Sequence, residues 1–529
     1  MGALMPEVTA RSQQLTQLDS KTWDLVVIGG GITGAGVAQQ AARRGWKVLL
    51  VEQRDFAWGT SSRSSKLVHG GLRYLKEGDI KTTLHSVWER ERLMREAPEL
   101  VQPQRFLFAD CKGRKPGRWL MQTGLMVYDL MAANHQTGGG HFYADLARTR
   151  TLEPGLNPPA LRGALVFTDA KTDDARLVQR VLMEAQGDGA VCLNYVAAEE
   201  LTLAEGKVCG VVLRDTVHGA RLAVQGRVVV NATGAWADRL RANLGAKPLL
   251  RPLRGSHLLV PHSRLPVQHS ISMMHVKDGR PVFLYPWEGC TLIGTTDLDH
   301  RGDLNVEASI TDAEVDYLLD AVNDQFPQAG LGRADIISTY AGVRPVVDDG
   351  QQDASKATRD HVVMDERGLI TLTGGKLTTF RLMAQDALAL AAPHVGQAFA
   401  RNKAPLFTPA TVNAAWSPAV RTRLAARYGH RAVAWAAGLP DTALEFVPTT
   451  HTLWAELAIA ARYEAVVHLD DLLLRRTRLG LLLPRGALDH IERIRALTEP
   501  HLQWGDSGWA TELARYRALV AQHYALPAD

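Results

Sequence analysis

Apolar and polar positions near the start of the chain follow the order strand, helix, strand. An apolar run at 25–28 leads into three glycines, and an Ala-rich helical pattern over 33–44 ends at Gly45. A second strand pattern follows at 47–51. This spacing predicts one βαβ unit. Such a unit is typical of a parallel sheet that has helices packed on its faces.

The pattern changes in the middle of the chain. Residues 174–187 predict an amphipathic helix, and 246–340 contain short apolar runs between Pro and Gly, with one helical segment at 312–324. We interpret 246–340 as a mostly antiparallel sheet. The strand and helix patterns return at 369–372 and 378–390, so we expect the first domain to be assembled from separated pieces.

The C-terminal part has the periodicity of helices. Its composition shifts to Ala, Leu, Arg and Trp, and apolar residues recur with helical spacing. We predict a separate helical domain there. The periodic segments are 419–437, 453–468, 472–483 and 488–497.

Composition excludes several classes of protein. The chain has 529 residues, of which 46% are hydrophobic and 22% charged, as expected for a globular protein of about three domains. A formal net charge of +4 permits contact with an anionic surface but is far too small for a dedicated nucleic-acid binder. The four cysteines show no C-x-x-C spacing, so no metal site is predicted.

No secretory signal or membrane span is predicted. Residues 1–22 are mostly polar and form a predicted flexible leader. Because no window approaches ~18 uninterrupted apolar residues, any membrane contact is expected to be peripheral. The basic run of Arg475, Arg476 and Arg478 lies among leucines. It is either a patch that faces a membrane or a helix face held by salt bridges.

Three glycines mark a dinucleotide-binding turn. Gly29, Gly31 and Gly34 stand between the first strand and the first helix, and Glu52 ends the second strand. The first glycine permits a tight turn, the second admits a pyrophosphate to the helix start, and the third allows close packing. Glu52 can accept a hydrogen bond from a ribose hydroxyl. The motif does not by itself separate FAD from NAD.

Three later segments favour FAD. The hydroxyl-rich loop 60–66 can donate to phosphates and a ribityl chain, and the glycine pair that follows lets backbone lie against a flat ring. The turn after 228–230 is similar to the second contact point of two-part FAD folds. Backbone N–H groups and a cation at 374–379 would stabilise an electron-rich flavin. The candidate cofactor-binding residues of these segments are Ser61, Ser62, Ser65, Lys66, Gly70, Gly71, Ala232, Thr233, Gly234, Gly374, Gly375, Leu377, Thr378 and Thr379.

Together these motifs resemble FAD-dependent glycerol-3-phosphate dehydrogenase of the bacterial, respiratory type. The strings HGGLRYL, GVRP and GGKLTT are far more specific than the glycine turn alone, and 468–480 is similar to that family's helical domain. The resemblance implies noncovalent FAD, with Gly342 among its contacts. The segments that carry it are 24–44, 60–75, 255–260, 293–297, 341–349 and 374–381.

The resemblance also implies a reaction and its partners. The substrate is sn-glycerol 3-phosphate, which loses a hydride from C2 to FAD and becomes dihydroxyacetone phosphate. Electrons pass to ubiquinone or menaquinone, and the enzyme is a homodimer held peripherally at the cytoplasmic face of the bacterial inner membrane. Three alternatives stay open: an oxidase that uses oxygen, a relative that oxidises an amino acid, and a flavoprotein without turnover.

Substrate chemistry agrees with the cations in these motifs. A phosphomonoester carries about −1.5 to −2 charges at pH 7, and guanidinium groups suit it well. Imidazole has a pKa suited to taking the proton of the C2 hydroxyl. His257 is the candidate for that base, and His69 is a weaker one. The resemblance implies substrate contacts for Arg73, Tyr74 and Arg359, and catalytic positions for His257, Arg344 and Lys376.

The predicted fold is α/β with an added α domain. It combines a two-part FAD-binding Rossmann-like domain, an antiparallel-sheet substrate domain and a C-terminal helical domain. The predicted bounds are 23–245 for the FAD-binding domain (with 95–165 contributing to the substrate domain), 246–340 for the substrate domain, 341–392 for the return segment of the FAD-binding domain, and 403–529 for the helical domain.

Overall fold

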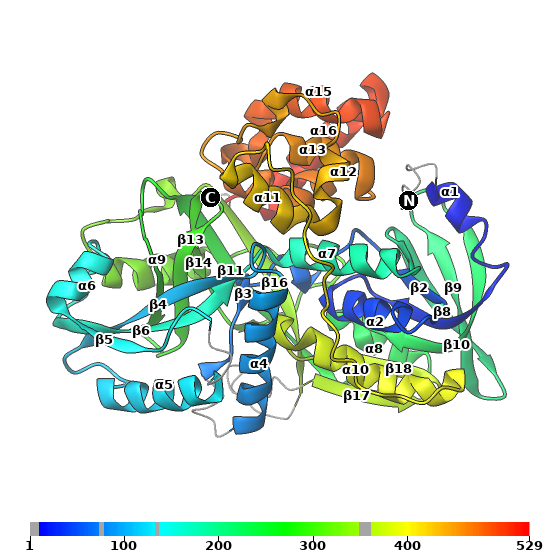
Figure 1. Ribbon diagram of the computed structural model, residues 1–529, viewed down its shortest axis with the longest axis horizontal. Coiled ribbons are helices and arrows are strands. Elements are labelled where there is room, and N and C mark those ends of the chain that lie inside the picture. Colours follow the sequence, from blue (N-terminus) through cyan, green and yellow to red (C-terminus); the bar gives the residue numbers. More distant parts are fainter. Residues whose placement is uncertain (1–9, 73–78, 133–136, 349–360, 528–529) are drawn as a thin grey trace.

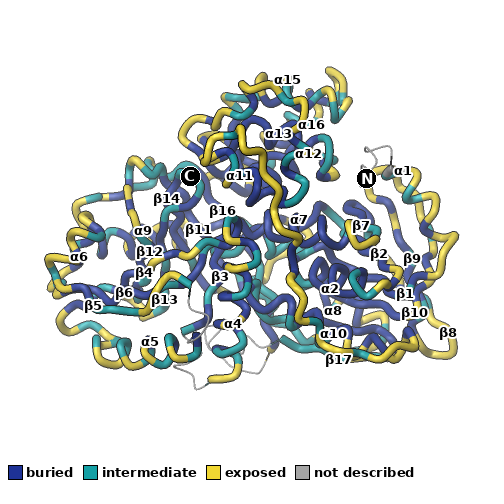
Figure 2. The backbone as a smooth tube through the Cα atoms, viewed as in Figure 1, coloured by how far each residue is buried: buried dark blue, intermediate teal, exposed yellow. Residues whose placement is uncertain are grey.

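Two sheets form the body of the molecule, and a group of helices sits above both of them (Figure 1). The computed structural model describes residues 10–72, 79–132, 137–348 and 361–527. Buried positions concentrate in the strands and in the helices next to them, and exposed positions lie on outer turns and helix faces (Figure 2). None of the helices in these four ranges has the length and apolar character that crossing a membrane requires.

The first sheet has eight strands and contains the predicted βαβ unit. Parallel strands run in the order β18-β10-β1-β2-β7, β17 pairs antiparallel with β18, and β8 and β9 extend from β10 as antiparallel strands. The central strands are Val- and Leu-rich because both faces of the sheet are covered. The strand bounds are Thr22–Ile28 (β1), Val48–Val51 (β2), Val191–Leu193 (β7), Val196–Ala204 (β8), Lys207–Asp215 (β9), Arg221–Asn231 (β10), His361–Glu366 (β17) and Leu369–Gly374 (β18).

Helices from distant parts of the chain cover this sheet. Helix α2 packs against both α7 and α10, and its small Ala and Gly side chains permit that close approach. The predicted helix at 174–187 is confirmed with the same bounds. Because α10 follows β18, the return of the chain to the first sheet is also confirmed. The helix bounds are Ile32–Ala42 (α2), Asp174–Gly187 (α7), Ala237–Ala242 (α8) and Phe380–Ala391 (α10).

The second sheet has ten strands and is mostly antiparallel, as predicted. Its main order is β15-β11-β14-β13-β12-β4-β6-β3, while β16 pairs with β11 and β5 with β6. Only β12 and β4 run parallel among its recorded pairs. The bounds are Leu67–Val68 (β3), Gln102–Cys111 (β4), Phe142–Asp145 (β5), Leu161–Lys171 (β6), Leu250–Pro261 (β11), Ser270–Met274 (β12), Pro281–Trp287 (β13), Cys290–Gly294 (β14), Leu298–Asp299 (β15) and Ser338–Val347 (β16).

The strand pairs place the domain junctions at other residues than those predicted from the apolar pattern. Strand β16 pairs with β11 from Ser338 to Val347, so the second sheet continues past the predicted junction at 340. Strand β6 continues to Lys171, beyond the predicted segment 95–165. At both junctions the pattern of apolar residues continues unchanged as the chain passes from one sheet toward the other. The pattern therefore does not mark where one domain ends. The helices beside this sheet are Ile80–Glu96 (α4), Arg118–Ala132 (α5), Leu146–Leu152 (α6) and Asp312–Gln325 (α9).

Part of the predicted flexible leader is structured. Helix α1 spans Ala10–Leu15, and the Arg11 guanidinium donates to the Asp215 carboxylate at 2.9 Å. Leu18 is buried at 1% exposure and packs in the core beside Trp23. Single charged and apolar residues of this kind give no periodic signal, so the sequence pattern alone did not indicate them.

The C-terminal helices share a hydrophobic core with the second sheet. Trp454 and Leu457 pack in one cluster with Leu259 and Trp287. The last helix, α16, had no predicted counterpart, because its apolar residues do not follow a single stripe. The bounds are Pro418–Tyr428 (α11), Ala432–Ala436 (α12), Ala455–Tyr463 (α13), Leu479–Leu482 (α14), Ile491–Leu502 (α15) and Gly505–His523 (α16), with a wide helical turn at Asp471–Arg476.

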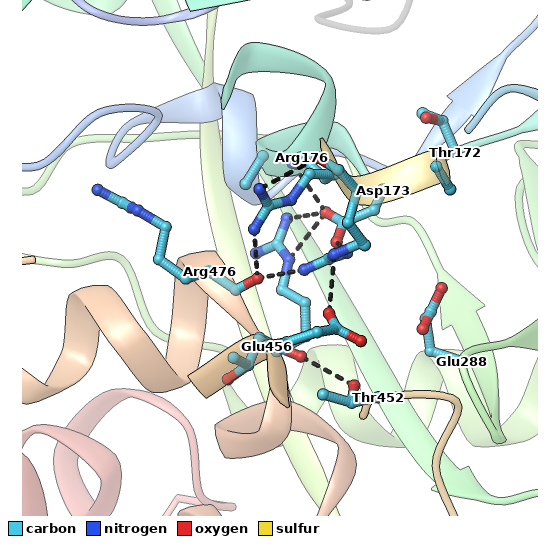
Figure 3. A network of polar contacts seen from close by, with 12 residues as sticks. Thr172, Asp173, Arg176, Glu288, Thr452, Glu456 and Arg476 are labelled. Carbon is cyan, nitrogen blue, oxygen red and sulfur yellow. Dashed lines mark hydrogen bonds and ion pairs between the residues drawn. The ribbon is translucent and has the colours of Figure 1, made fainter. Parts of the chain in front are cut away.

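The basic run in this domain is buried. Arg475, Arg476 and Arg478 are each at most 1% exposed, and the first two form ion pairs with Asp55. Figure 3 shows the neighbouring network, in which the carbonyl of Arg476 accepts a hydrogen bond from Arg176 at 2.9 Å. Of the two interpretations of this run, the helix face held by salt bridges is confirmed and the membrane-facing patch is wrong. A local run of cations does not reveal that acidic partners from distant segments enclose it.

Candidate active site

Bare backbone packs tightly where β1 turns into α2. Gly29 has φ +114°, and a Cβ there would lie 2.4 Å from the carbonyl oxygen of Ala232. A Cβ on Gly34 would lie 1.9 Å from the carbonyl oxygen of Gly29. Only glycine fits at these two positions. At Gly31, the residue just before α2, a Cβ would lie 3.0 Å from Ser61 Oγ.

The start of α2 presents backbone N–H groups. Gly31 offers no side chain to cap the helix, and Ser61 Oγ accepts from the Ile32 N–H at 3.0 Å. The partial positive charge of a helix start favours an anionic group. This end of α2 can therefore hold a phosphate beside the Ser61 hydroxyl.

Glu52 lies beside the same turn. Its two carboxylate oxygens accept from the Gly30 N–H at 2.8 Å and from the Arg54 N–H at 3.0 Å. Burial raises the pKa of Glu52, and the two N–H groups oppose that rise. The residue predicted to bind a ribose hydroxyl is therefore positioned at the glycine turn.

Side chains of the loop 60–66 point in different directions. Ser65 Oγ lies 2.9 Å from His257 Nε2. The Lys66 ammonium is fully buried and donates to the Ser62 carbonyl at 3.0 Å and to Asp174 at 3.1 Å. Burial lowers the pKa of Lys66 to about 8, although Asp174 opposes the shift. The Lys66 ammonium thus stabilises the loop 60–66 from the protein interior. It does not lie at the glycine turn, where a cofactor contact was predicted for it.

The turn after β10 joins three strand ends. The Ala232 N–H donates to the Ile28 carbonyl at 2.9 Å, and Thr233 Oγ1 donates to Asn231 Oδ1 at 2.7 Å. Thr373 Oγ1 donates to the Gly234 carbonyl at 3.3 Å. The carboxyl ends of β1, β10 and β18 therefore meet at one edge, where open α/β sheets bind their ligands.

A second glycine turn connects β18 with α10. Gly374 and Gly375 have φ of +76° and +70°, followed by a short 3₁₀ turn at Leu377–Thr379. Thr378 Oγ1 donates to the His69 carbonyl at 3.2 Å. The chain between His69 and Gly71 is thereby brought against this turn.

Gly70 and Gly71 allow that approach. A Cβ at Gly70 would lie 2.3 Å from Tyr128 Oη, and its N–H donates to Tyr128 Oη at 2.8 Å. Gly71 has φ +79°. At Gly342 of β16 a Cβ would lie 2.6 Å from the carbonyl oxygen of Arg63, so bare backbone also lines this side of the loop 60–66.

Three candidate catalytic residues come from three elements. His257 of β11 pairs with Tyr340 of β16, and Arg344 follows four residues later on the same face of β16. Arg344 donates to Asp297 Oδ1 at 2.9 Å and to Thr295 Oγ1 at 3.0 Å. Lys376 donates to Ser86 Oγ of α4 at 3.3 Å.

Burial keeps His257 neutral. Its ring is 0% exposed and stacks on Tyr340 with centroids 4.5 Å apart. Burial, and then the charges of Arg344 and Lys66, hold the pKa of His257 well below its usual range. Its Nδ1 has no hydrogen-bond partner within the described part of the chain. Nε2 can accept a proton from the Ser65 hydroxyl.

Three predicted substrate residues cannot be placed, because Arg73, Tyr74 and Arg359 lie outside the described residues.

Other residues of the site were not predicted. Asp174 accepts from the Ser64 hydroxyl at 2.7 Å and from Lys66, and Tyr128 orients Gly70. Asp174 lies at the start of α7, where acidic residues are common because of the helix dipole alone. Nothing specific in the sequence therefore indicates that Asp174 also binds Ser64 and Lys66.

The residues at this edge fit FAD. The tight glycine turn, the open start of α2 and the carboxylate of Glu52 suit an adenine dinucleotide. Two further glycine segments, at 70–71 and 374–375, place bare backbone close to the same loops. The backbone N–H groups and hydroxyls can donate to pyrophosphate, and the carboxylate can accept from the ribose hydroxyls.

Comparison with known proteins agrees with this geometry. A family model described as FAD dependent oxidoreductase matches residues 24–383, and one described as the C-terminal domain of alpha-glycerophosphate oxidase matches 370–508. The fold and site thus define an FAD-dependent oxidoreductase.

Curated relatives and a solved structure show which family of FAD-dependent oxidoreductases the chain resembles. The aerobic glycerol-3-phosphate dehydrogenase of Bacillus subtilis is 38% identical over 72% of this chain and 68% of its own length. Glycerol-3-phosphate dehydrogenase 2 of Mycobacterium tuberculosis is 36% identical over 95% of this chain and 89% of its own length. The structure of glycerol-3-phosphate dehydrogenase from Bacillus halodurans complexed with FAD has a TM-score of 0.76 at 27% identity, covering 97% of this chain and 98% of that one. The chain belongs to the family of FAD-dependent glycerol-3-phosphate dehydrogenases.

Proposed function

We propose that the protein oxidises sn-glycerol 3-phosphate at C2 to dihydroxyacetone phosphate. The observation that carries this proposal is the placement of Arg344 and His257 on one face of the second sheet, beside Ser65. Arg344 supplies a guanidinium for the phosphate, held in place by Asp297 and Thr295. The 36–38% identity to proteins named glycerol-3-phosphate dehydrogenase supports the choice of substrate.

Noncovalent FAD supplies the acceptor for the hydride that leaves C2. The groups that would hold it are the start of α2, Glu52 and Ser61, and the backbone of the turns at 232–234 and 374–379. Lys376 adds a positive charge beside the second of these turns, where it would stabilise a flavin that takes up electrons.

Ser65 and His257 take the proton of the substrate hydroxyl. The C2 hydroxyl gives its proton to Ser65 Oγ while the Ser65 proton moves to His257 Nε2, 2.9 Å away. This relay follows from the burial of His257, which has no exposed surface of its own. The low pKa of His257 keeps the imidazole neutral near pH 7, so the Nε2 lone pair is available to take the proton.

The electrons then pass to ubiquinone or menaquinone in a membrane, with the enzyme, as a homodimer, attached at the cytoplasmic face of a bacterial inner membrane. The word "aerobic" in the relatives' names supports a respiratory acceptor. An oxidase that yields peroxide is the second candidate, because residues 370–508 match a domain described from alpha-glycerophosphate oxidase.

Anaerobic reduction of the bound flavin tests the substrate. We expect glycerol 3-phosphate to bleach the flavin absorbance, and glycerol, glycine and sarcosine to leave it unchanged. Arg344→Gln should slow bleaching by tenfold or more, because a charge-assisted pair to phosphate contributes about 1.5–3 kcal/mol. The matched control Arg333→Gln removes an exposed ion pair of the same domain and should have no effect. Bleaching by an amino acid alone would overturn the proposal.

A second assay identifies the acceptor. With glycerol 3-phosphate as donor, the enzyme should reduce a short-chain quinone much faster than it forms peroxide. Peroxide produced at the quinone rate would assign the protein as an oxidase.

A further inference from the structure

Helix α9 carries a buried carboxylate that has no part in the proposed reaction. This residue, Glu314, lies in the first turn of the helix and is 2% exposed. Its Oε1 accepts from the Ser256 hydroxyl at 2.8 Å and from the Thr296 hydroxyl at 2.7 Å. Its Oε2 accepts from the Arg254 guanidinium at 2.7 Å. An acceptor-only group suits this position, because every one of these partners is a donor.

A helix cap explains only part of this arrangement. Thr311 and Glu314 form a capping box, in which the N–H and the hydroxyl of Thr311 donate to Oε2 at 3.0 and 2.9 Å. Such a box satisfies backbone groups at the start of a helix and needs no further partner. The contacts with Ser256 and Thr296 are therefore additional, and they join α9 to two segments of the second sheet.

The first of these segments is β11, the strand that carries His257. Successive side chains of a strand point to opposite faces, so Ser256 and His257 lie on different faces of the sheet. The face with Ser256 packs against α9 (Figure 1), and on the other face His257 contacts Ser65. Glu314 thus holds the residue next to the proposed base without touching the base.

The second segment is 295–297, which connects β14 with β15. Two of its residues, Thr295 and Asp297, are the hydrogen-bond partners of Arg344. Thr296 lies between them and donates to the carboxylate on α9. Thr296 Oγ1 also accepts from the Ser256 N–H at 2.9 Å, so the two segments are bonded to each other at the same carboxylate.

We propose that Glu314 is a positioning residue of the active site, which fixes the proposed base and the phosphate-binding arginine in one geometry from the opposite face of the second sheet. His257 and Arg344 come from two strands, and a substrate must meet both of them at once. A displacement of about 1 Å in such a geometry can lower a rate by about a hundredfold. The inference rests on the proposed function for the roles of His257 and Arg344.

Variants of the carboxylate and of its partners separate positioning from folding. Glu314→Gln weakens both links, because an amide turns N–H groups toward some of the donors. Ser256→Ala removes the side-chain link to β11, and Thr296→Val removes the link to the segment after β14. The matched control Asp312→Asn makes the same change from acid to amide on the same helix, at an exposed ion pair with Arg333.

The FAD-loaded variants are compared by kcat and KM for glycerol 3-phosphate, expressed per bound FAD. We expect Glu314→Gln to lower kcat/KM by at least about tenfold. Ser256→Ala should act mainly on kcat, which depends on the base, and Thr296→Val mainly on KM, which depends on binding of the phosphate. Asp312→Asn and Thr311→Ala should keep wild-type kinetics, although Thr311→Ala should melt at a lower temperature because the helix loses its cap.

Two kinetic results would overturn the proposal. One is wild-type kcat and KM per bound FAD in Ser256→Ala and Thr296→Val, whatever their melting temperatures; these two variants decide the question even if Glu314→Gln does not bind FAD. The other is a loss of kcat/KM in Thr311→Ala as large as that in Glu314→Gln, which would assign the effect to the helix cap.

Crystal structures of the FAD-loaded variants give a readout that needs no substrate. We expect the 2.9 Å contact between Arg344 and Asp297 to lengthen beyond hydrogen-bond distance in Thr296→Val. In Ser256→Ala the 2.9 Å contact of His257 with the loop 60–66 should lengthen likewise. Unchanged contacts in both variants would overturn the positioning role. Lengthened contacts in a protein whose flavin is not reduced by glycerol 3-phosphate would contradict the proposed substrate alone.

Discussion

His257 is a residue whose proton affinity depends on two separate causes. Burial disfavours the imidazolium, and the nearby Arg344 and Lys66 add repulsion in the same direction. Below the pKa of an unfolded histidine, near 6.5, the unfolded chain binds a proton that the native His257 rejects. This residue therefore makes the protein less stable as the pH falls through that range.

The same shift sets the acid limit of catalysis. Since the neutral imidazole is the base, turnover on glycerol 3-phosphate should persist well below pH 6.5 in the wild type. Arg344→Gln removes one of the charges that lower the pKa of His257, so its acid limb should move to higher pH, in addition to the loss of substrate affinity. The pH profile of kcat/KM measures both effects. An acid limb at the same pH in the wild type and the variant would contradict this account of His257.

At the scale of elements, the sequence indicated the helices, strands and turns that are specified by patterns of neighbouring residues. The glycine turn, α2, α7 and the return through β18 and α10 follow from apolar periodicity and glycine spacing. The β16 junction and α16 did not, because the chain passes between sheets without a change of pattern and because α16 has no single apolar stripe. Contacts such as Lys66 with Asp174 join residues more than a hundred positions apart, and no local signal encodes them.

One such long-range contact ties the C-terminal domain to the loop 60–66. Arg478 has φ +65° and donates to Asp173 at 3.0 Å and to the carbonyl of Ser62 at 3.3 Å. Although burial acts to raise it, Arg478 and Arg427 hold the pKa of Asp173 well below its usual range. The loop that bonds His257 is therefore anchored from another domain.

Removing this anchor should loosen FAD as well as the fold. Arg478→Gln leaves buried carboxylates without their partner, which costs about 3–5 kcal/mol, and the loop 60–66 loses one support. We expect a lower melting temperature and faster FAD release on dilution. The control Arg485→Gln breaks an ion pair whose arginine is 71% exposed and should change neither. If Arg478→Gln lowers the melting temperature but leaves FAD release unchanged, the anchor is structural only.

On the scale of the whole molecule, the three parts share their interiors. The second sheet and the C-terminal helices form one hydrophobic cluster around Trp454, Leu457 and Trp287. Buried ion pairs such as Arg176 with Glu464 and Arg427 with Asp173 join the C-terminal helices to α7 and the chain just before it. Because separate domains with their own cores would lack these contacts, we expect the parts to unfold together.

A substitution at the centre of the shared cluster tests this cooperativity. Trp454 is 2% exposed, and Trp454→Ala removes a large buried ring at a cost of about 3–5 kcal/mol. We expect the loss of helical circular dichroism and the release of FAD fluorescence to shift to lower temperature by the same amount. The control Trp416→Ala alters a partly buried ring that packs on the separate cluster of α11, α12 and α13, and its shift should be smaller. If FAD release stays at the wild-type temperature while the helical signal melts earlier, the C-terminal domain unfolds independently of the sheets.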